Sequence, residues 1–389
     1  MSPVPATIAV RVVVAQLCAT VPGGTARYAA QLVRALARTA PPGAVLDAVT
    51  SRPCAATAEL PVPVRALHLP DPLLSRLWER GLPPWVARAG LVHAPTLQMP
   101  PSWRGSPVVV TIHDVVPWTH PSTLTARGVA FHRRIGARAA RQAAAIVTPT
   151  EAVAAQVREL LDPVVPVVPV LSGVAITPVP ADAALRRARL TRAGGSASAV
   201  SAPAGGADAA YPYVLFVGTT EPRKGLDVAV AALASPQLAG VHLLVVGPPG
   251  WGDVRVLDLA AAAGVADRVV VTGPVSDADL AALYAGARAL AMPSRAEGFG
   301  FPVLEAMAHG VPVVTSDDPA LVEVGAGAAL VAPIGEASPL ADALASVVDD
   351  GAARERLVVA GRERAAHLTW AQTAEHMWGL YSRLLAYTR

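Results

Sequence analysis

The feature that most constrains this chain is the alternation of short apolar runs with longer amphipathic stretches, which continues through both halves of the sequence. Apolar runs of about four to eight residues predict strands that are buried on both faces, and the stretches between them have helical spacing. Strands that alternate with helices form parallel sheets covered by helices on both sides. We therefore predict an α/β chain in which each half forms its own doubly wound parallel sheet.

The expected strands divide evenly between the two halves, six in each. In the first half the strands are Thr7–Val14, Val45–Val49, Leu91–His93, Val108–Ile112, Ala145–Thr148 and Val164–Leu171, and the helices are Ala26–Arg38, Leu124–Ala144 and Glu151–Leu161. In the second half the strands are Tyr213–Val217, His242–Val246, Arg268–Thr272, Ala289–Met292, Pro312–Thr315 and Ala329–Val331. Its helices are Leu226–Ala234, Val254–Ala263, Asp279–Ala285, Val303–Ala308, Leu340–Val348, Ala352–His367 and Trp370–Tyr387.

Length and a change of composition indicate two domains. The 389 residues are about twice the length of a typical single domain. Between Arg192 and Ala210 the chain is almost entirely Ala, Gly, Ser and Pro, which is typical of a flexible connector. We predict an N-terminal domain over 1–182, a linker over 183–210, a second domain over 211–370 and a final helix over 371–389.

Composition excludes several classes of protein. With 53% apolar and 16% charged residues, the chain is not mainly disordered. Its longest uncharged stretches are broken by prolines, and its N-terminus lacks the basic start of a signal peptide, so we expect a cytoplasmic protein. The two cysteines, Cys18 and Cys54, exclude a disulfide framework and a cysteine-based zinc site and favour a reduced setting.

Charge is divided unequally. Residues 1–190 contain 19 Lys/Arg and nine Asp/Glu, whereas residues 191–389 contain 13 and 20. On the expected helix Leu124–Ala144, one face carries arginines, with Phe131 and Ile135 nearby; these arginines are Arg127, Arg134, Arg138 and Arg141. Such a face predicts either contact with an anionic membrane surface or a plainly solvated helix. We expect no nucleic-acid partner.

The first loop that carries chemistry follows the strand Tyr213–Val217 and runs from Gly218 to Gly225. It contains Arg223 and then Lys224, the only lysine in the chain, where a compact ammonium replaces the usual guanidinium. Adjacent cations at a helix start are unfavourable unless an anion lies between them, and a diphosphate fits there. The alternative is a solvated turn with a chance lysine.

The second loop follows the strand Ala289–Met292 and carries Glu297, Gly298 and Gly300 ahead of a helix that contains Glu305. The glycines permit close approach of a ligand to the backbone, the helix start can face phosphate, and the carboxylates can accept hydrogen bonds from hydroxyl groups. The spacing of Gly298, Gly300 and Val303 only half matches a dinucleotide fingerprint, because the third glycine is absent. NAD is therefore disfavoured.

These two loops resemble those of the retaining GT-B glycosyltransferases of group 1, which are marked by two glutamates eight positions apart, here Glu297 and Glu305. The resemblance is close over 211–335. It is looser over 1–180, where Gly23-Gly24 and His113-Asp114 carry it.

The resemblance implies a GT-B fold of two Rossmann-like domains that face each other across a cleft, with the last helix packed back on the first domain. It also implies transfer of a hexosyl group, with retention, from a nucleotide-diphospho-sugar to a hydroxyl of a glycan, glycolipid or small molecule. No cofactor or metal is implied. Mannosyl transfer from GDP-mannose is mildly favoured. The alternatives are a GT-B nucleotide-sugar epimerase and a non-catalytic module that binds a sugar or a partner.

The resemblance also implies roles for individual residues. His113, Arg223, Lys224 and Glu297 resemble catalytic residues, with His113 near the anomeric centre and the two cations on the departing diphosphate. The residues that resemble donor-binding positions are Gly23, Gly24, Gly218, Arg223, Lys224, Glu297, Gly298, Phe299, Gly300, Phe301 and Glu305.

Overall fold

The computed structural model describes residues 8–19, 23–86, 90–103, 105–193, 211–250, 252 and 254–387. The chain forms two compact units. Unit 1 comprises Met1–Pro121, Thr125–Gly173 and Leu368–Arg389, and unit 2 comprises Ser122–Leu124 and Val174–His367. The predicted linker residues 194–210 lie outside the described residues.

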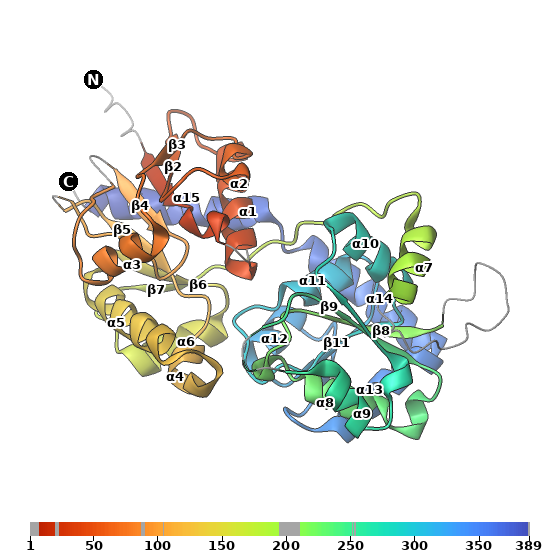
Figure 1. Ribbon diagram of the computed structural model, residues 1–389. Helices are drawn as coiled ribbons and strands as arrows, with labels where there is room; N and C mark the ends of the chain where they lie inside the picture. Colours follow the sequence, from red (N-terminus) through yellow and green to blue (C-terminus); the bar gives the residue numbers. More distant parts are fainter. Residues whose placement is uncertain are drawn as a thin grey trace. The chain divides into compact units, whose positions relative to one another are not determined.

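Unit 1 contains a parallel sheet of seven strands in the order β3-β2-β1-β4-β5-β6-β7 (Figure 1). Its strands are β1 (Ala9–Val13), β2 (Val45–Thr50), β3 (Val64–Ala66), β4 (Leu91–Ala94), β5 (Val108–Thr111), β6 (Ala145–Thr148) and β7 (Val167–Pro169). Its helices include α1 (Gly24–Arg38), α2 (Ala55–Ala58), α3 (Asp71–Glu79), α4 (Val116–Thr119), α5 (Ala126–Gln142), α6 (Glu151–Leu161) and α15 (Trp370–Tyr387), with a short 3-10 turn η1 (Ala15–Cys18).

Unit 2 contains a parallel sheet of six strands in the order β10-β9-β8-β11-β12-β13. Its strands are β8 (Tyr213–Val217), β9 (His242–Val246), β10 (Val269–Gly273), β11 (Ala289–Met292), β12 (Val313–Ser316) and β13 (Leu330–Ala332). Its helices include α7 (Ala183–Ala193), α8 (Leu226–Leu233), α9 (Val256–Ala262), α10 (Asp277–Gly286), α11 (Phe301–Ala308), α12 (Pro319–Gly325), α13 (Ala337–Asp349) and α14 (Gly351–Ala366), and η3 (Pro222–Lys224) is a 3-10 turn. The expected fold class, two Rossmann-like α/β sheets, is confirmed.

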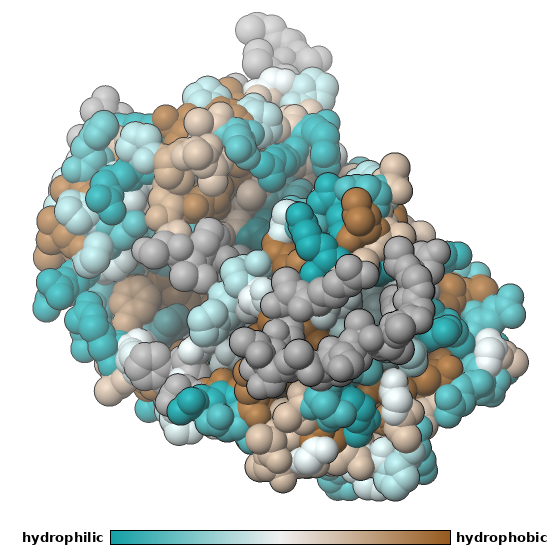
Figure 2. Space-filling model, turned by 45° about the vertical axis from the view of Figure 1, so that its right-hand side comes forward, coloured by the Kyte–Doolittle hydropathy of each residue, from teal (hydrophilic) through white to brown (hydrophobic). Residues whose placement is uncertain are grey.

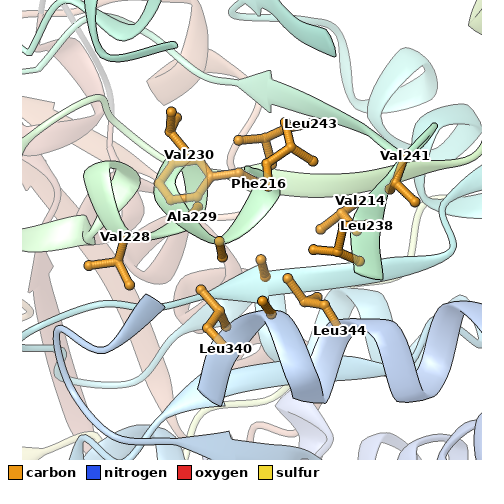
Figure 3. Close-up of a cluster of buried hydrophobic side chains, with 14 of the residues drawn as sticks. Val214, Phe216, Val228, Ala229, Val230, Leu238, Val241, Leu243, Leu340 and Leu344 are labelled. Atoms are coloured by element: carbon orange, nitrogen blue, oxygen red, sulfur yellow. The ribbon is translucent and has the colours of Figure 1, made fainter. Parts of the chain in front are cut away.

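Each unit has its own hydrophobic core, because strands that are apolar on both faces need a helical layer on each side. In unit 2, Val214 and Phe216 of β8 pack with Leu340 and Leu344 of α13 (Figure 3). On the face shown in Figure 2, hydrophobic residues are interspersed with hydrophilic ones. Among the described residues, no helix combines the length and hydropathy that crossing a bilayer requires.

The expectations for the linker and for the cysteines were wrong. Residues 183–193, which we assigned to the linker, form helix α7, and Arg186 of this helix pairs with Asp279 of α10 at 2.8 Å. Cys18 and Cys54, which we expected to be reduced, are joined by a disulfide with a Cα–Cα distance of 5.8 Å. The pairing follows from the sheet: Val13 of β1 lies opposite Val49 of β2, and each cysteine comes five residues later at the same sheet edge.

The C-terminal helix α15 is anchored to unit 1 by polar contacts as well as by packing against α1. The Trp378 Nε1–H donates to the carbonyl of Leu36 at 3.2 Å. The His93 ring, fully buried in β4, shares hydrogen bonds with the Tyr381 hydroxyl (2.7 Å) and the Thr111 hydroxyl (2.9 Å). His93 is thus a packed residue of the unit 1 core.

Removing the hydroxyl group of Tyr381 should destabilise unit 1. In Tyr381→Phe the buried His93 nitrogen loses its partner, which typically costs about 1–3 kcal/mol. Urea unfolding should therefore show a lower free energy of unfolding for this variant. Tyr387→Phe is the matched control, because Tyr387 lies on the same helix and is 88% exposed. An equal loss in both variants would contradict the role of the buried hydrogen bond.

The buried His93 should also make stability depend on pH. Burial lowers its pKa from 6.5 to about 3. The folded chain therefore keeps this ring neutral where the unfolded chain protonates it, and the stabilisation present above pH 6.5 is lost as the pH falls toward 3. We expect the unfolding free energy of the wild type to drop between about pH 6.5 and 4 more steeply than that of His93→Gln. Replacing the exposed His367 by Gln should leave the slope unchanged.

Candidate functional site

The topology of unit 2 brings its two chemistry-bearing loops together. Strands β8 and β11 are neighbours, with Leu215 opposite Leu290, although 71 residues separate β8 from β11 along the chain. The strand order reverses between these two strands, and ligands of open α/β sheets bind beyond the carboxyl ends of strands at such a point. The loop after β8 carries Arg223 and Lys224, and the loop after β11 carries Glu297.

The two loops touch through their backbones. Gly225 has a φ of +69°, and a Cβ at this position would lie 2.0 Å from the carbonyl oxygen of Pro293. Only glycine fits this combination of a left-handed backbone and close approach. The backbone N–H of Arg295 donates to the Arg223 carbonyl at 2.7 Å, which joins the loops directly. These backbone contacts alone therefore place Arg223 and Lys224 beside the second loop.

The side chains then form a compact ionic cluster. Lys224 Nζ lies 2.5 Å from Glu297 Oε1, and Arg223 contacts Glu297 Oε2 at 3.3 Å. Arg223 also donates to the Ala296 carbonyl at 2.7 Å and pairs with Glu221 at 2.6 Å. The Ser294 hydroxyl donates to Glu297 Oε1 at 2.8 Å. The structure thus brings Arg223, Lys224 and Glu297 together, as their shared site requires.

The electrostatics of Glu297 follow from this cluster. Its side chain is only 7% exposed, and burial alone would raise the pKa of the carboxyl group. The Lys224 and Arg223 charges and the hydrogen bonds from Lys224 and Ser294 outweigh burial and lower the pKa to about 2. Glu297 is therefore a carboxylate throughout the neutral range.

A second carboxylate lies on the helix that follows. Glu305 of α11 is 7% exposed, and its Oε2 accepts a hydrogen bond from the Tyr284 hydroxyl at 3.1 Å. The Tyr284 ring stacks on His309, with ring centroids 5.1 Å apart. His309 Nδ1 lies 2.7 Å from the Glu305 carbonyl at the end of α11. Tyr284 therefore holds Glu305 in place.

The turn between the two glutamates leads into α11. Gly300 is the N-cap of this helix with a φ of +84°, and Phe301 begins the helix. Phe299 is buried, and its ring lies 4.9 Å from that of Phe301. Gly298 is also buried. Gly218 lies at the end of β8 beside the lysine stem: a Cβ at this position would lie 3.9 Å from Lys224 Cε, at ordinary van der Waals distance.

Sequence reasoning missed three residues that support the site: Ser294, Tyr284 and Asp318. Asp318 Oδ2 accepts the Glu297 N–H at 3.2 Å, while its Oδ1 caps α12 by accepting the N–H groups of Ala320 and Leu321. Burial raises the pKa of the Asp318 carboxyl. An acidic residue directly before a helix-starting proline was a capping signal in the sequence. No sequence signal connected Asp318 to Glu297.

The predicted residues of unit 1 lie at the corresponding edge of its own sheet. Gly23 is the N-cap of α1, and Gly24 is the first residue of that helix. His113 follows β5, and its Nε2–H donates to the Pro95 carbonyl at 2.7 Å. Burial lowers the pKa of His113, so the neutral ring with its proton on Nε2 is favoured. The Asp114 carboxylate accepts the Val116 N–H at 3.1 Å, at the start of α4.

Both halves of the chain match a family of glycosyltransferases. Residues 201–364 match the family Glycosyl transferases group 1, and residues 22–174 match Glycosyltransferase Family 4. O-antigen chain mannosyltransferase B of Escherichia coli is 34% identical over 175 residues, which are 44% of this chain and 46% of that protein. D-inositol 3-phosphate glycosyltransferase of Nocardia farcinica is 36% identical over 185 residues, covering 45% and 41%. The aligned segments thus span less than half of these relatives.

A solved structure resembles the chain over nearly its whole length. Anabaena Alr3699/HepE in complex with UDP-glucose matches with a TM-score of 0.71 and covers 97% of this chain and 100% of that chain, at 17% identity. At this identity the likeness shows the fold. The two family matches, the two parallel sheets and the solved structure agree, and the chain belongs to the group 1 family of GT-B glycosyltransferases.

Proposed function

We propose that this protein transfers a hexosyl group from a nucleotide-diphospho-sugar to an acceptor hydroxyl with retention of configuration. The observation that carries the proposal is the cluster in unit 2, where Lys224 and Arg223 flank the covered carboxylate of Glu297 at the switch point of the sheet. This cluster offers fixed cations for a diphosphate and a permanent anion for sugar hydroxyls.

The chemistry of the reaction matches these groups. When the bond between sugar and phosphate breaks, positive charge develops on the ring and negative charge on the leaving diphosphate. Arg223 and Lys224 would stabilise the diphosphate, and Glu297 would accept hydrogen bonds from hydroxyls of the transferred sugar. Glu305, held by Tyr284, would accept the ribose hydroxyls. The start of α11 and the Gly298–Phe301 backbone would provide N–H groups.

The leaving phosphate oxygen would take the proton of the acceptor hydroxyl on the same face of the ring, so configuration is kept without a glutamate nucleophile. Since the two cations carry the phosphate charge, we propose that the reaction needs no divalent metal. In unit 1 we propose His113 as the residue that contacts the sugar and Gly23-Gly24 as the backbone that admits donor phosphate and acceptor.

We propose mannosyl transfer from GDP-mannose as the first donor to test. The name of the E. coli relative, a mannosyltransferase, supports this choice. The Anabaena protein was solved in complex with UDP-glucose, which makes UDP-glucose the second donor to test. The acceptor is proposed to be a hydroxyl of a glycan, glycolipid or small molecule.

Glu297→Gln should separate catalysis from binding. The variant keeps the size of the side chain but removes its charge, so we expect turnover to fall at least about 100-fold while GDP or UDP still binds. Released nucleotide is measured with each donor, with and without candidate acceptors, and EDTA should leave the wild-type rate unchanged. Donor consumption without acceptor and release of free nucleotide would indicate an epimerase. Nucleotide binding with no turnover in the wild type under any combination would favour a binding module.

We also propose that unit 1 rests on an anionic membrane surface. On α5, Arg127 and Arg141 are exposed, and Arg134 remains 58% exposed beside Glu79. Fewer arginines line the outer face of α5 than we predicted, because Arg138 turns inward and donates to the carbonyls of Trp78 and Met99. The predicted apolar neighbours also point inward: Ile135 is fully buried, and Phe131 packs on the core.

Exposed apolar side chains are found instead on α3 and on the segment that follows it. Helix α3 lies beside α5, because Arg134 pairs with Glu79 and Arg138 donates to the Trp78 carbonyl. Leu73 is 44% exposed, and Leu82 and Trp85 are each 46% exposed. The exposed Arg76 and Arg80 lie among them. Arginine with tryptophan and leucine is the combination that favours the interface of an anionic bilayer.

Vesicle co-sedimentation tests this membrane surface. Vesicles with about one third phosphatidylglycerol should sediment the protein at low salt and release it at high salt, because surface charges are screened. Reversing Arg127 and Arg141 to Glu should weaken binding about tenfold or more. The same double reversal at Arg255 and Arg356, exposed residues of unit 2, is the control. Absence of binding at either salt concentration would contradict the proposal.

A further inference from the structure

One arginine outside the ionic cluster joins the two loops that build it. Arg295 follows Ser294, and its guanidinium makes a two-pronged pair with Asp227 of α8, at 2.8 and 2.7 Å. The same guanidinium donates to the Pro222 carbonyl at 2.9 Å. Arg295 therefore spans from the loop after β11 to the first turn of α8 and to the loop after β8.

We infer that Arg295 and Asp227 form a latch that positions Arg223 and Lys224 against Glu297. The latch acts on the site through the backbone of the neighbouring turn. The Arg295 guanidinium donates to the carbonyl of Pro222, the residue directly before the two cations. The backbone N–H of Arg295 donates to the Arg223 carbonyl at 2.7 Å. The cation-bearing turn is thereby tied to the loop that carries Glu297.

The arrangement suits a positioning role for three physical reasons. A guanidinium can bind a carboxylate with two parallel N–H groups and still donate to a carbonyl, which an ammonium cannot do in the same geometry. The turn η3 is only three residues long, so its position depends on contacts with its neighbours. Asp227 lies in the first turn of α8, where a carboxylate is favoured by the helix dipole.

The electrostatics agree with a formed pair. Arg295 lowers the pKa of Asp227, and Asp227 raises the pKa of Arg295. The pair is partly exposed, with side chains 31% and 46% accessible, so its contribution to global stability is small. Its effect is expected in the position of the cations rather than in the folding of unit 2.

The inference rests on the proposed function for its binding readout but not for its structural one. Hydrogen–deuterium exchange of the backbone amides over 218–226 reports the position of the turn without any ligand. In Arg295→Ala we expect faster exchange in this segment and unchanged exchange in β9. Calorimetry with GDP and UDP should show about tenfold weaker binding at unchanged stoichiometry, whereas partial unfolding would lower the stoichiometry instead.

Matched variants make the test specific. Asp227→Ala should weaken nucleotide binding to a similar degree, the double variant should lose no more than Arg295→Ala alone, and Arg295→Lys should lie between the wild type and Arg295→Ala. The control is Arg255→Ala, which removes an exposed ion pair with Asp258 at 3.0 Å on the same unit and should change nothing.

The outcomes separate the two proposals. Unchanged exchange over 218–226 in both Arg295→Ala and Asp227→Ala, or an equal effect in Arg255→Ala, would overturn the latch. If the wild type binds neither GDP nor UDP, the proposed function fails, while the exchange measurement still decides whether the latch holds the turn.

Discussion

A carboxylate that is almost covered by protein needs cationic partners, and the Glu297 carboxylate obtains them from a loop more than 70 residues away in the chain. This requirement explains several local choices at once. Strands β8 and β11 must be neighbours, Gly225 must lack a side chain where the loops touch, and Ser294 must donate to the same carboxylate. The cluster is costly to bury unless every partner is in place.

Residues around the cluster position its charged groups through further hydrogen bonds. Asp318 holds the backbone of Glu297 from the side of β12, and Tyr284 holds Glu305 from α10. Arg295 joins the two loops at the opposite end of the cation turn. These contacts fix the positions of the charged groups. Unit 2 therefore has a preorganised set of charges at one edge of its sheet.

Much of this could be predicted from the amino-acid pattern. The continuous apolar runs at Tyr213–Val217 and Ala289–Met292 identified the two central strands of unit 2, because buried parallel strands have no polar face. Lys224 stood out as the single lysine, and Glu297 and Glu305 by their spacing. Strand adjacency then follows from the doubly wound order, so the meeting of Lys224 and Glu297 was foreseeable.

Other features depended on tertiary contacts that leave no periodic signal. Strand β3 has only three residues, and α3 begins between two prolines, so neither has a clear repeat. Helix α7 is held by an ion pair between its Arg186 and Asp279, which lies 93 residues further along the chain. The pairing of Cys18 with Cys54 needed the register of β1 and β2, and Arg138 turned inward because two carbonyls were available below α5.

The path of the chain also has a consequence for synthesis. Unit 1 begins with β1 but is completed by α15, whose Tyr381 and Trp378 supply hydrogen bonds to β4 and α1. On the ribosome these residues are made after all of unit 2. The nascent second unit can therefore close its core first, and the first unit has to wait, with the α15-facing side of α1 uncovered, until α15 has left the exit tunnel.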